Sequence, residues 1–152
     1  MPIRPAELDW VTDRIAVGGM LFDKDDMDRV AAAGVTHILN LNGFDDTHLA
    51  RPHGIVTCWN TVDDDMKPKA PEFFERGVAF AKSAMRQKGA KLYIHCAAGV
   101  NRAPMMTLAV LCSMGWGMLD AMRHMRVCRP CVNFPEVYVK SVLRYLERRS
   151  SR

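Results

Sequence analysis

One stretch, residues 91–104, constrains the fold of this chain more than any other part of its sequence. Residues 92–94 are a short apolar, β-prone run that is typical of a buried strand. A proline then precedes the apolar-rich residues 105–114 and suits the first turn of a helix. The loop between strand and helix gathers backbone N–H groups at one spot, where the helix dipole adds partial positive charge. The sequence therefore predicts an anion-binding loop, with Cys96 at its start and Arg102 at its end.

The loop carries a specific signature, namely His95-Cys96, five residues, and then Arg102. It resembles the H-C-x(5)-R motif of the cysteine-dependent protein tyrosine and dual-specificity phosphatases. The spacing has a chemical reason, because the loop must wrap a tetrahedral phosphate with its amides and return a guanidinium for bidentate contact. Gly99 permits the close approach of the backbone. A merely structural buried cysteine has no need of histidine, glycine and arginine at these offsets.

The resemblance implies a role for each residue of the loop. Cys96 is expected to be the nucleophile, with its thiolate favoured by Arg102 and by the helix N-terminus. Arg102 is expected to clamp two phosphate oxygens, and His95 to orient the loop and support the thiolate. The other phosphate contacts are expected from the backbone amides of Ala97, Ala98, Gly99, Val100, Asn101 and Arg102. Neither a metal nor a cofactor is expected.

The resemblance also implies an aspartate, on a loop upstream of the signature, that protonates the leaving oxygen. Three candidates are adjacent, Asp63, Asp64 and Asp65. When Phe74 and Phe80 are matched to the aromatic pair that the family carries on the next helix, the acid falls on Asp64. Asp64 is therefore the predicted general acid, and its two neighbours remain the alternatives.

Two positions depart from the commonest family pattern. Ala103 stands where the family usually has a serine or threonine whose hydroxyl stabilises the departing thiolate, so slow hydrolysis of the phosphoenzyme is expected. The Arg-Ala-Pro sequence resembles the phosphatases of regenerating liver and the plant glucan phosphatases, and Asn101 resembles the RNA 5′-triphosphatase branch. The loop interior has no lysine, which disfavours a phosphoinositide substrate.

The chain is expected to form one dual-specificity phosphatase-like catalytic domain over residues 1–152, with a hydrophobic content of 49% that is ordinary for a soluble protein. No apolar run has transmembrane length, and residues 1–5 lack a signal-peptide core. Five cysteines in such a chain favour a reducing, cytoplasmic compartment. Cys128 and Cys131 have metal-like spacing without a second ligand pair, which favours a structural role. The formal charge of +4 is mild, so neither a nucleic acid nor a membrane is expected as a partner, and a monomer is expected.

The order of patterns predicts an α/β fold, a mostly parallel central sheet flanked by helices like that of the dual-specificity phosphatases. The anion site then lies at the carboxyl edge of that sheet. Strands are predicted from apolar runs, and helices from amphipathic periodicity. The predicted strands are a pair over 8–19, then 35–41, 55–59 and 91–95, and the predicted helices are 23–33, 71–87, one from 104, 119–127 and 135–147. Residues 43–54 are predicted to be a loop.

These features predict a protein phosphatase that hydrolyses phosphotyrosine, phosphoserine or phosphothreonine monoesters through a cysteinyl-phosphate intermediate, with a phosphorylated protein as its partner. Two alternatives remain open. The same chemistry could act on a non-protein substrate such as a phosphoglucan or an RNA 5′-phosphate, or the chain could be a phosphate-binding pseudoenzyme.

Overall fold

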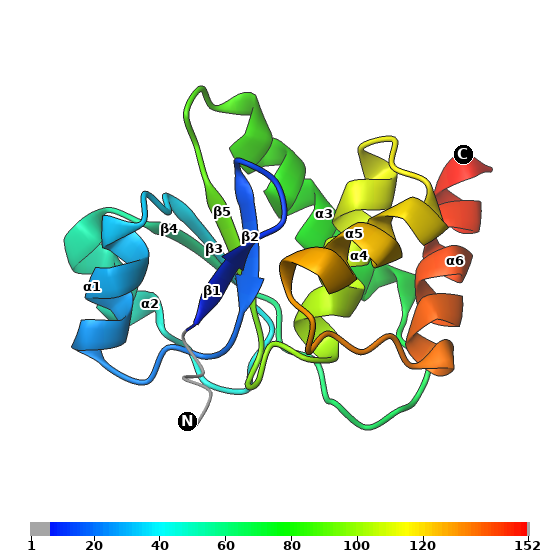
Figure 1. The fold of residues 1–152 in the computed structure, drawn as a ribbon, viewed down its shortest axis with the longest axis horizontal. Coiled ribbons are helices and arrows are strands. Elements are labelled where there is room, and N and C mark those ends of the chain that lie inside the picture. The colour runs from blue at the N-terminus through cyan, green and yellow to red at the C-terminus, as the bar shows by residue number, and fades with distance from the viewer. Residues whose placement is uncertain (1–6, 152) are drawn as a thin grey trace.

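A five-stranded sheet lies at the centre of the computed structural model, which describes residues 7–151 (Figure 1). The strands are β1 (Leu8–Trp10), β2 (Ile15–Gly18), β3 (His37–Asn40), β4 (Val56–Trp59) and β5 (Leu92–His95). Their order across the sheet is β1-β2-β5-β3-β4. Only β1 is antiparallel to its neighbour, and β2, β5, β3 and β4 run parallel. The predicted mostly parallel sheet is therefore confirmed. Residues 1–5, which are expected to lack a signal-peptide core, lie outside the described residues.

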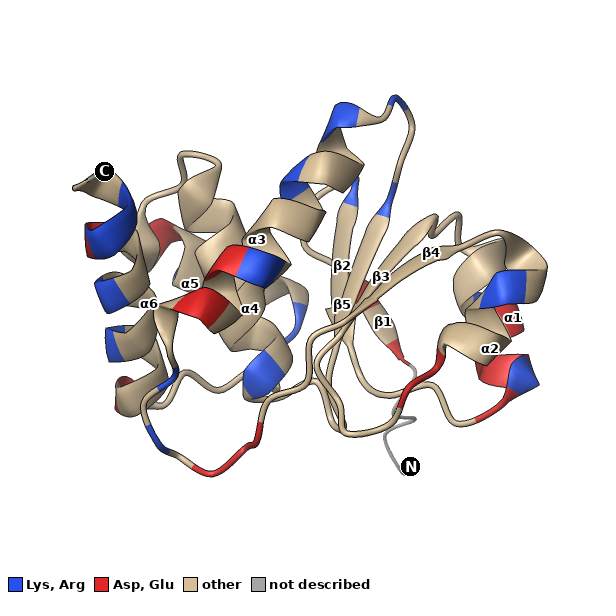
Figure 2. Cartoon of the chain, turned by 180° about the vertical axis from the view of Figure 1, so that it is seen from behind, with Lys and Arg blue, Asp and Glu red and all other residues tan. Residues whose placement is uncertain are grey.

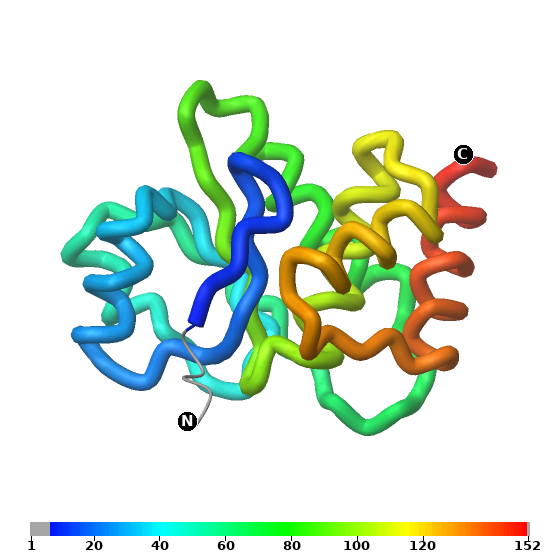
Figure 3. The backbone as a smooth tube through the Cα atoms, viewed as in Figure 1, coloured from blue at the N-terminus to red at the C-terminus, as the bar shows by residue number. Residues whose placement is uncertain are grey.

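Helices cover both faces of this sheet, as the tube in Figure 3 also shows. On one side lie α1 (Lys24–Ala32), α2 (Thr47–Ala50) and the short 3₁₀ helix η1 (Arg51–His53). On the other lie α3 (Pro71–Arg86), α4 (Arg102–Ser113), α5 (Met118–Cys128) and α6 (Glu136–Ser150). No helix within residues 7–151 combines the length and apolar character that crossing a membrane requires.

Alternating side chains of the strands build two separate cores, because successive residues of a strand point to opposite faces. In β5, Leu92 and Ile94 pack with α3, α4 and α6, whereas Tyr93 packs with α1 on the other face. Helix α4 lies at the centre of the larger core, with almost every side chain buried. This all-round burial fixes the helix that follows the signature loop.

Two sequence predictions are wrong in detail. Residues 43–54, predicted to be a loop, contain α2 and η1, which are too short to show a helical period. Asp45 forms a local turn before α2 by accepting a hydrogen bond from the Thr47 backbone, and Gly54 ends the segment with φ +68°. The helix predicted from Pro104 begins at Arg102, because the first turn of a helix needs no N–H donor and accepts a proline.

The parallel strands bring four loops to one edge of the sheet. β2, β5, β3 and β4 all end there, so the loops that follow them meet at their carboxyl ends. The loop after β5 is the signature loop. The loops after β2 and β3 lie beside it, and Met20 donates its backbone N–H to the Ala97 carbonyl at 3.0 Å.

Candidate active site

Cys96 opens the signature loop directly after β5. Its side chain is 2% exposed, and its Sγ accepts a hydrogen bond from the Gly99 backbone at 3.3 Å. A sulfur that accepts from an amide at the N-terminal end of a helix is stabilised as a thiolate by both dipoles. The loop therefore folds back over the sulfur, as a nucleophile beneath a bound phosphate requires.

Arg129, which sequence reasoning missed, holds two carbonyls of this loop from outside. It is 2% exposed, and its Nε and its second terminal nitrogen donate to Gly99 O at 2.9 Å and Ala98 O at 3.0 Å. Its other terminal nitrogen pairs with the Asp9 carboxylate at 2.9 Å. A guanidinium presents its donors as a rigid fork, so it fixes both peptide planes at once.

The neighbouring carbonyls of the loop are also held from outside. The Val100 carbonyl accepts from the Asn133 backbone at 2.8 Å. The Ala97 carbonyl accepts from the β2–α1 loop, and the Cys96 carbonyl lies 3.3 Å from the His95 ring nitrogen Nδ1. Every backbone carbonyl of residues 96–100 thus contacts a group that is not one of these five residues.

These contacts orient the amides. In a planar trans peptide the C=O and N–H point in opposite directions. With the carbonyls of residues 96–100 turned outward, the N–H groups of residues 97–101 turn toward the inside of the loop. The result is a cradle of backbone donors, which suits an oxyanion such as phosphate.

Gly99 must be a glycine for two reasons. Its φ of +69° is a conformation that side chains disfavour, and a Cβ would lie 2.5 Å from the backbone of Gly18. The same Cβ would lie 2.7 Å from the Arg129 guanidinium. The glycine therefore allows β2 and Arg129 to approach the loop closely enough to hold it.

Arg102 closes the loop at the first residue of α4. One terminal nitrogen donates to the Val62 carbonyl at 3.0 Å, and Nε is buried without a hydrogen-bond partner among the described residues. A buried guanidinium donor with no partner is costly, and an anion in the loop supplies the acceptor. The bond to Val62 also ties this arginine to the acidic segment that follows β4.

Asp64 lies over the loop and is held by two hydrogen bonds. The Asn101 side chain donates to one carboxylate oxygen at 3.1 Å, and the Tyr138 hydroxyl donates to the other at 2.7 Å. Burial, followed by the bond to Asp64, raises the pKa of Tyr138 to about 12, so the phenol stays a donor at neutral pH. Asn133 donates in turn to the Asn101 side chain at 3.1 Å.

The two alternative acids lie elsewhere. Asp65 pairs with Lys69 at 2.5 Å and accepts from the Lys67 backbone, and the bond to Lys69 lowers the pKa of Asp65. Asp63 is exposed, as Asp64 is, but within residues 7–151 it has no hydrogen bond to the signature loop. Of the three aspartates, the structure therefore brings Asp64 to the signature loop.

His95 is oriented by Asp46, a second residue that the sequence did not single out. His95 Nε2 lies 2.8 Å from Asp46 Oδ2, and both side chains are almost completely buried. The ring stacks on Tyr93 with centroids 5.4 Å apart. The other ring nitrogen, Nδ1, lies 3.3 Å from the Cys96 carbonyl. His95 thus connects a buried carboxylate to the peptide that carries the nucleophile.

Cys128 and Cys131 lie outside this site. Cys128 Sγ is 3.5 Å from His124 Nε2, which itself contacts the Val11 carbonyl at 2.5 Å, and Cys131 is exposed. Burial raises the pKa of the Cys128 thiol, which favours its neutral form. Within residues 7–151, no group of three or more potential ligands could hold a metal ion.

Comparison with known proteins identifies relatives of this chain. The family model described as "Dual specificity phosphatase, catalytic domain" matches residues 23–148. A probable rhodanese domain-containing dual specificity protein phosphatase of Dictyostelium discoideum is 30% identical over 113 residues, which are 73% of this chain and 23% of the relative. Dual specificity protein phosphatase 22-B of Danio rerio is 25% identical over 118 residues, which are 76% of this chain and 61% of the relative. The chain thus spans less than two thirds of either relative.

Solved structures share the fold. The crystal structure of PTPMT1 in complex with PI(5)P superimposes with a TM-score of 0.84 at 17% identity, covering 95% of this chain and 97% of that one. Human DUSP28 superimposes with a TM-score of 0.80 at 20% identity, covering 98% of each chain. The α/β architecture is therefore that of the small phosphatases of this type.

Proposed function

The chain belongs to the dual specificity phosphatase family, and we propose that it is a cysteine-dependent protein phosphatase. Its substrates are phosphotyrosine, phosphoserine or phosphothreonine monoesters on proteins, and residues 1–152 act as one catalytic domain. We place it in the cytoplasm, where its five cysteines, all free of disulfides, remain reduced.

One observation carries this proposal. The carbonyls of residues 96–100 are turned away from the centre of the loop, so that the amides of the loop surround the space above the Cys96 sulfur. Arg102 and Asp64 reach the same loop. This arrangement supports the proposal that nucleophile, oxyanion donors and acid act on one phosphate group.

In the first step, the Cys96 thiolate attacks phosphorus and the bond from phosphorus to the leaving oxygen breaks. Asp64 donates its proton to that oxygen, so the substrate alcohol departs neutral. The charge that develops on the remaining phosphate oxygens is stabilised by the loop amides and by bidentate contact with Arg102.

In the second step, the Asp64 carboxylate takes a proton from water, and the water oxygen attacks the phosphocysteine. The sulfur–phosphorus bond breaks, inorganic phosphate forms, and the sulfur leaves as a thiolate. The amide of Gly99, which lies 3.3 Å from the sulfur, stabilises this thiolate.

The loop favours a single phosphate over a polyphosphorylated headgroup. PTPMT1, a structural neighbour, was crystallised with PI(5)P, whose headgroup carries a single phosphomonoester, so the loop disfavours only lipids with several phosphomonoesters. In this chain the interior side chains of the loop are Ala97, Ala98 and Val100, and none of them supplies a cation for a second phosphate.

Substitution of the nucleophile tests the proposal. Cys96→Ser should abolish hydrolysis of an aryl phosphate and of phosphopeptides in the presence of EDTA, while tungstate binding and thermal stability stay close to the parent. Cys131→Ser, at an exposed cysteine, is the matched control and should retain full activity. Turnover that survives Cys96→Ser, or that needs a metal ion, contradicts the mechanism.

A further inference from the structure

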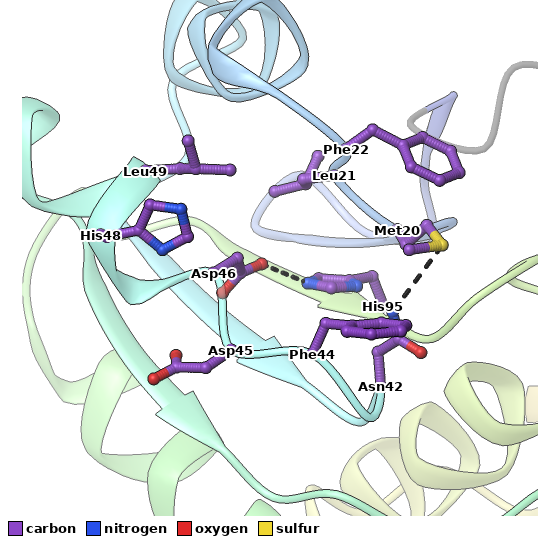
Figure 4. Close-up of a pocket in the computed structure, with 10 residues that line it drawn as sticks. All are labelled: Met20, Leu21, Phe22, Asn42, Phe44, Asp45, Asp46, His48, Leu49 and His95. Atoms are coloured by element: carbon purple, nitrogen blue, oxygen red, sulfur yellow. Dashed lines mark hydrogen bonds and ion pairs between the residues drawn. The ribbon is translucent and has the colours of Figure 1, made fainter.

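A cavity of about 420 Å³ lies beside the signature loop and takes no part in the reaction described above (Figure 4). It lies between the loop after β2 and the segment after β3 that includes α2, and His95 forms part of its wall. Its volume is within the range of small-molecule and side-chain sites. Ten residues line it, namely Met20, Leu21, Phe22, Asn42, Phe44, Asp45, Asp46, His48, Leu49 and His95.

The cavity is a direct neighbour of the phosphate cradle. His95 is covalently bonded to Cys96, and Met20 donates its backbone N–H to the Ala97 carbonyl at 3.0 Å. Both places lie at the carboxyl edge of the sheet. Since an extended peptide advances about 3.3 Å per residue, a side chain one to three residues from a bound phosphoresidue can reach this cavity.

The cavity combines apolar walls with carboxylates. Phe22 and Phe44 are 59% and 72% exposed at its rim, which is unusual for two such large apolar side chains beside one cavity. Leu21 and Leu49 line it further in. Such walls fit the aliphatic stem of a long side chain, and the aromatic faces fit a cation.

Two aspartates supply the negative charge. The Asp46 side chain is 6% exposed; its Oδ2 lies 2.8 Å from His95 Nε2, and its Oδ1 is buried with no hydrogen-bond partner within residues 7–151. Asp45 is exposed, and hydrogen bonds from Thr47 lower the pKa of Asp45, with smaller effects of His48 and Arg51. One carboxyl group thus lies inside the cavity, and a second, held in its charged form, lies at its mouth.

The segments of the chain around the cavity also carry a net negative charge. Residues 20–49 contain six aspartates and only two basic residues, although the whole chain carries a formal charge of +4. Figure 2 shows the acidic residues of α1 and of the segment before α2 on one side of the molecule, with the basic residues of α6 on the far side. The local field therefore attracts a cation to this cavity.

We propose that this cavity is a specificity pocket that takes a lysine or arginine side chain of the phosphorylated protein, one to three residues from the phosphorylated one. The inference rests on the proposed function and deepens it. The aliphatic stem packs against the rings of Phe22 and Phe44, and the cationic end pairs with Asp45 at the mouth. His95 stays in its place as part of the wall.

Paired phosphopeptides test the inference. One peptide of each pair carries lysine, and the other carries norleucine, which keeps the stem without the charge, at one of the three positions on either side of phosphotyrosine. At one or more positions the lysine peptide should have a kcat/KM about tenfold higher, since an exposed ion pair and a cation–π contact contribute about fivefold and about twofold. This preference should fall as NaCl is raised.

Two variants with matched controls localise the effect. Asp45→Asn keeps the acceptor for Thr47 and removes only the charge, and Phe44→Ala removes the ring. Each should reduce the lysine preference at least about twofold and leave hydrolysis of a small aryl phosphate unchanged. Asp120→Asn and Leu119→Ala, at exposed positions of α5, should leave the preference intact.

The outcomes separate the two proposals. Equal rates for lysine and norleucine peptides, a preference for norleucine, or a lysine preference that survives both variants overturns the pocket while the phosphatase stands. If neither the aryl phosphate nor any peptide is hydrolysed, the proposed function fails. In that case fluorescence anisotropy of the same peptide pairs on the Cys96→Ser protein still tests the pocket, and equal affinities overturn it.

Discussion

Arg129→Lys is the sharpest test of the idea that the phosphate cradle is held from outside. Arg129 makes two hydrogen bonds to adjacent loop carbonyls and one ion pair with Asp9. A lysine keeps the charge, but its ammonium is a single point and cannot bond both carbonyls as the fork does. The substitution therefore frees at least one peptide plane of the loop without leaving an uncompensated carboxylate.

The expected magnitudes follow from these bonds. A hydrogen bond from a charged donor contributes about 1.5–3 kcal/mol, so losing one or both lowers the free energy of unfolding by about 1.5–6 kcal/mol. For a chain of this size each kcal/mol shifts Tm by about 2–4 °C, which gives a fall of about 3–24 °C. A loop amide that no longer faces the phosphate should also weaken tungstate inhibition and lower kcat/KM for aryl phosphates by about tenfold to a hundredfold.

Two controls isolate the loop bonds. Arg123→Lys changes an exposed arginine of α5, the helix that ends just before Arg129, and should alter neither Tm nor inhibition. Asp9→Asn removes the ion pair alone, and because the Asp9 side chain is 37% exposed, it should cost less than about 1 kcal/mol. The reasoning is refuted if Arg129→Lys matches Arg123→Lys in Tm and tungstate inhibition, or if Asp9→Asn reproduces the full effect.

Two further predictions concern the proton transfer and the second chemical step. Asp64→Asn should slow phosphopeptide hydrolysis by about 10²–10⁴-fold. It should slow substrates with good leaving groups much less, because only poor leaving groups need the proton. A larger leaving-group dependence for Asp63→Asn in steady-state assays would contradict the assignment. Ala103 is fully buried in the first turn of α4, and without a hydroxyl there, hydrolysis of the phosphoenzyme should limit turnover and give a product burst. Ala103→Ser should raise the steady-state rate by about tenfold to a hundredfold and shrink the burst in rapid-quench kinetics. If the parent shows no burst and the variant turns over no faster, hydrolysis of the phosphoenzyme is not the rate-limiting step.

Apart from Asp64, which the family resemblance predicts, the parts of the site that sequence reasoning found are those whose spacing is local. Cys96 and Arg102 bracket one loop, and the strand before it and the helix after it show clear apolar patterns. Strand and helix periodicity also predicted the sheet, because each element buries one regular face. The prediction of a loop over residues 43–54 was wrong because α2 has only four residues, too few to show a helical period in the sequence.

The parts that sequence reasoning missed are joined over long stretches of chain. Arg129 contacts Gly99 across 30 residues, Asp46 contacts His95 across 49, and Tyr138 contacts Asp64 across 74. No local pattern connects such pairs, and an arginine at a helix end or a tyrosine in an amphipathic face reads as surface or core. Asp46 had one weak signal, its place in the segment that follows a strand ending at the carboxyl edge of the sheet.

The signature loop by itself does not distinguish a phosphate-binding protein from a phosphatase. A phosphate-binding protein without turnover needs the loop amides and Arg102, and hence the groups that turn the loop carbonyls outward. Hydrolysis adds a requirement that lies outside the loop, an acid held where the leaving oxygen emerges. Here the Asp64 carboxylate is fixed from one side by Asn101 of the loop and from the other by Tyr138 of α6. Because Asn101 belongs to the phosphate loop as well, the leaving-group dependence of Asp64→Asn is the measurement that separates an enzyme from a pseudoenzyme.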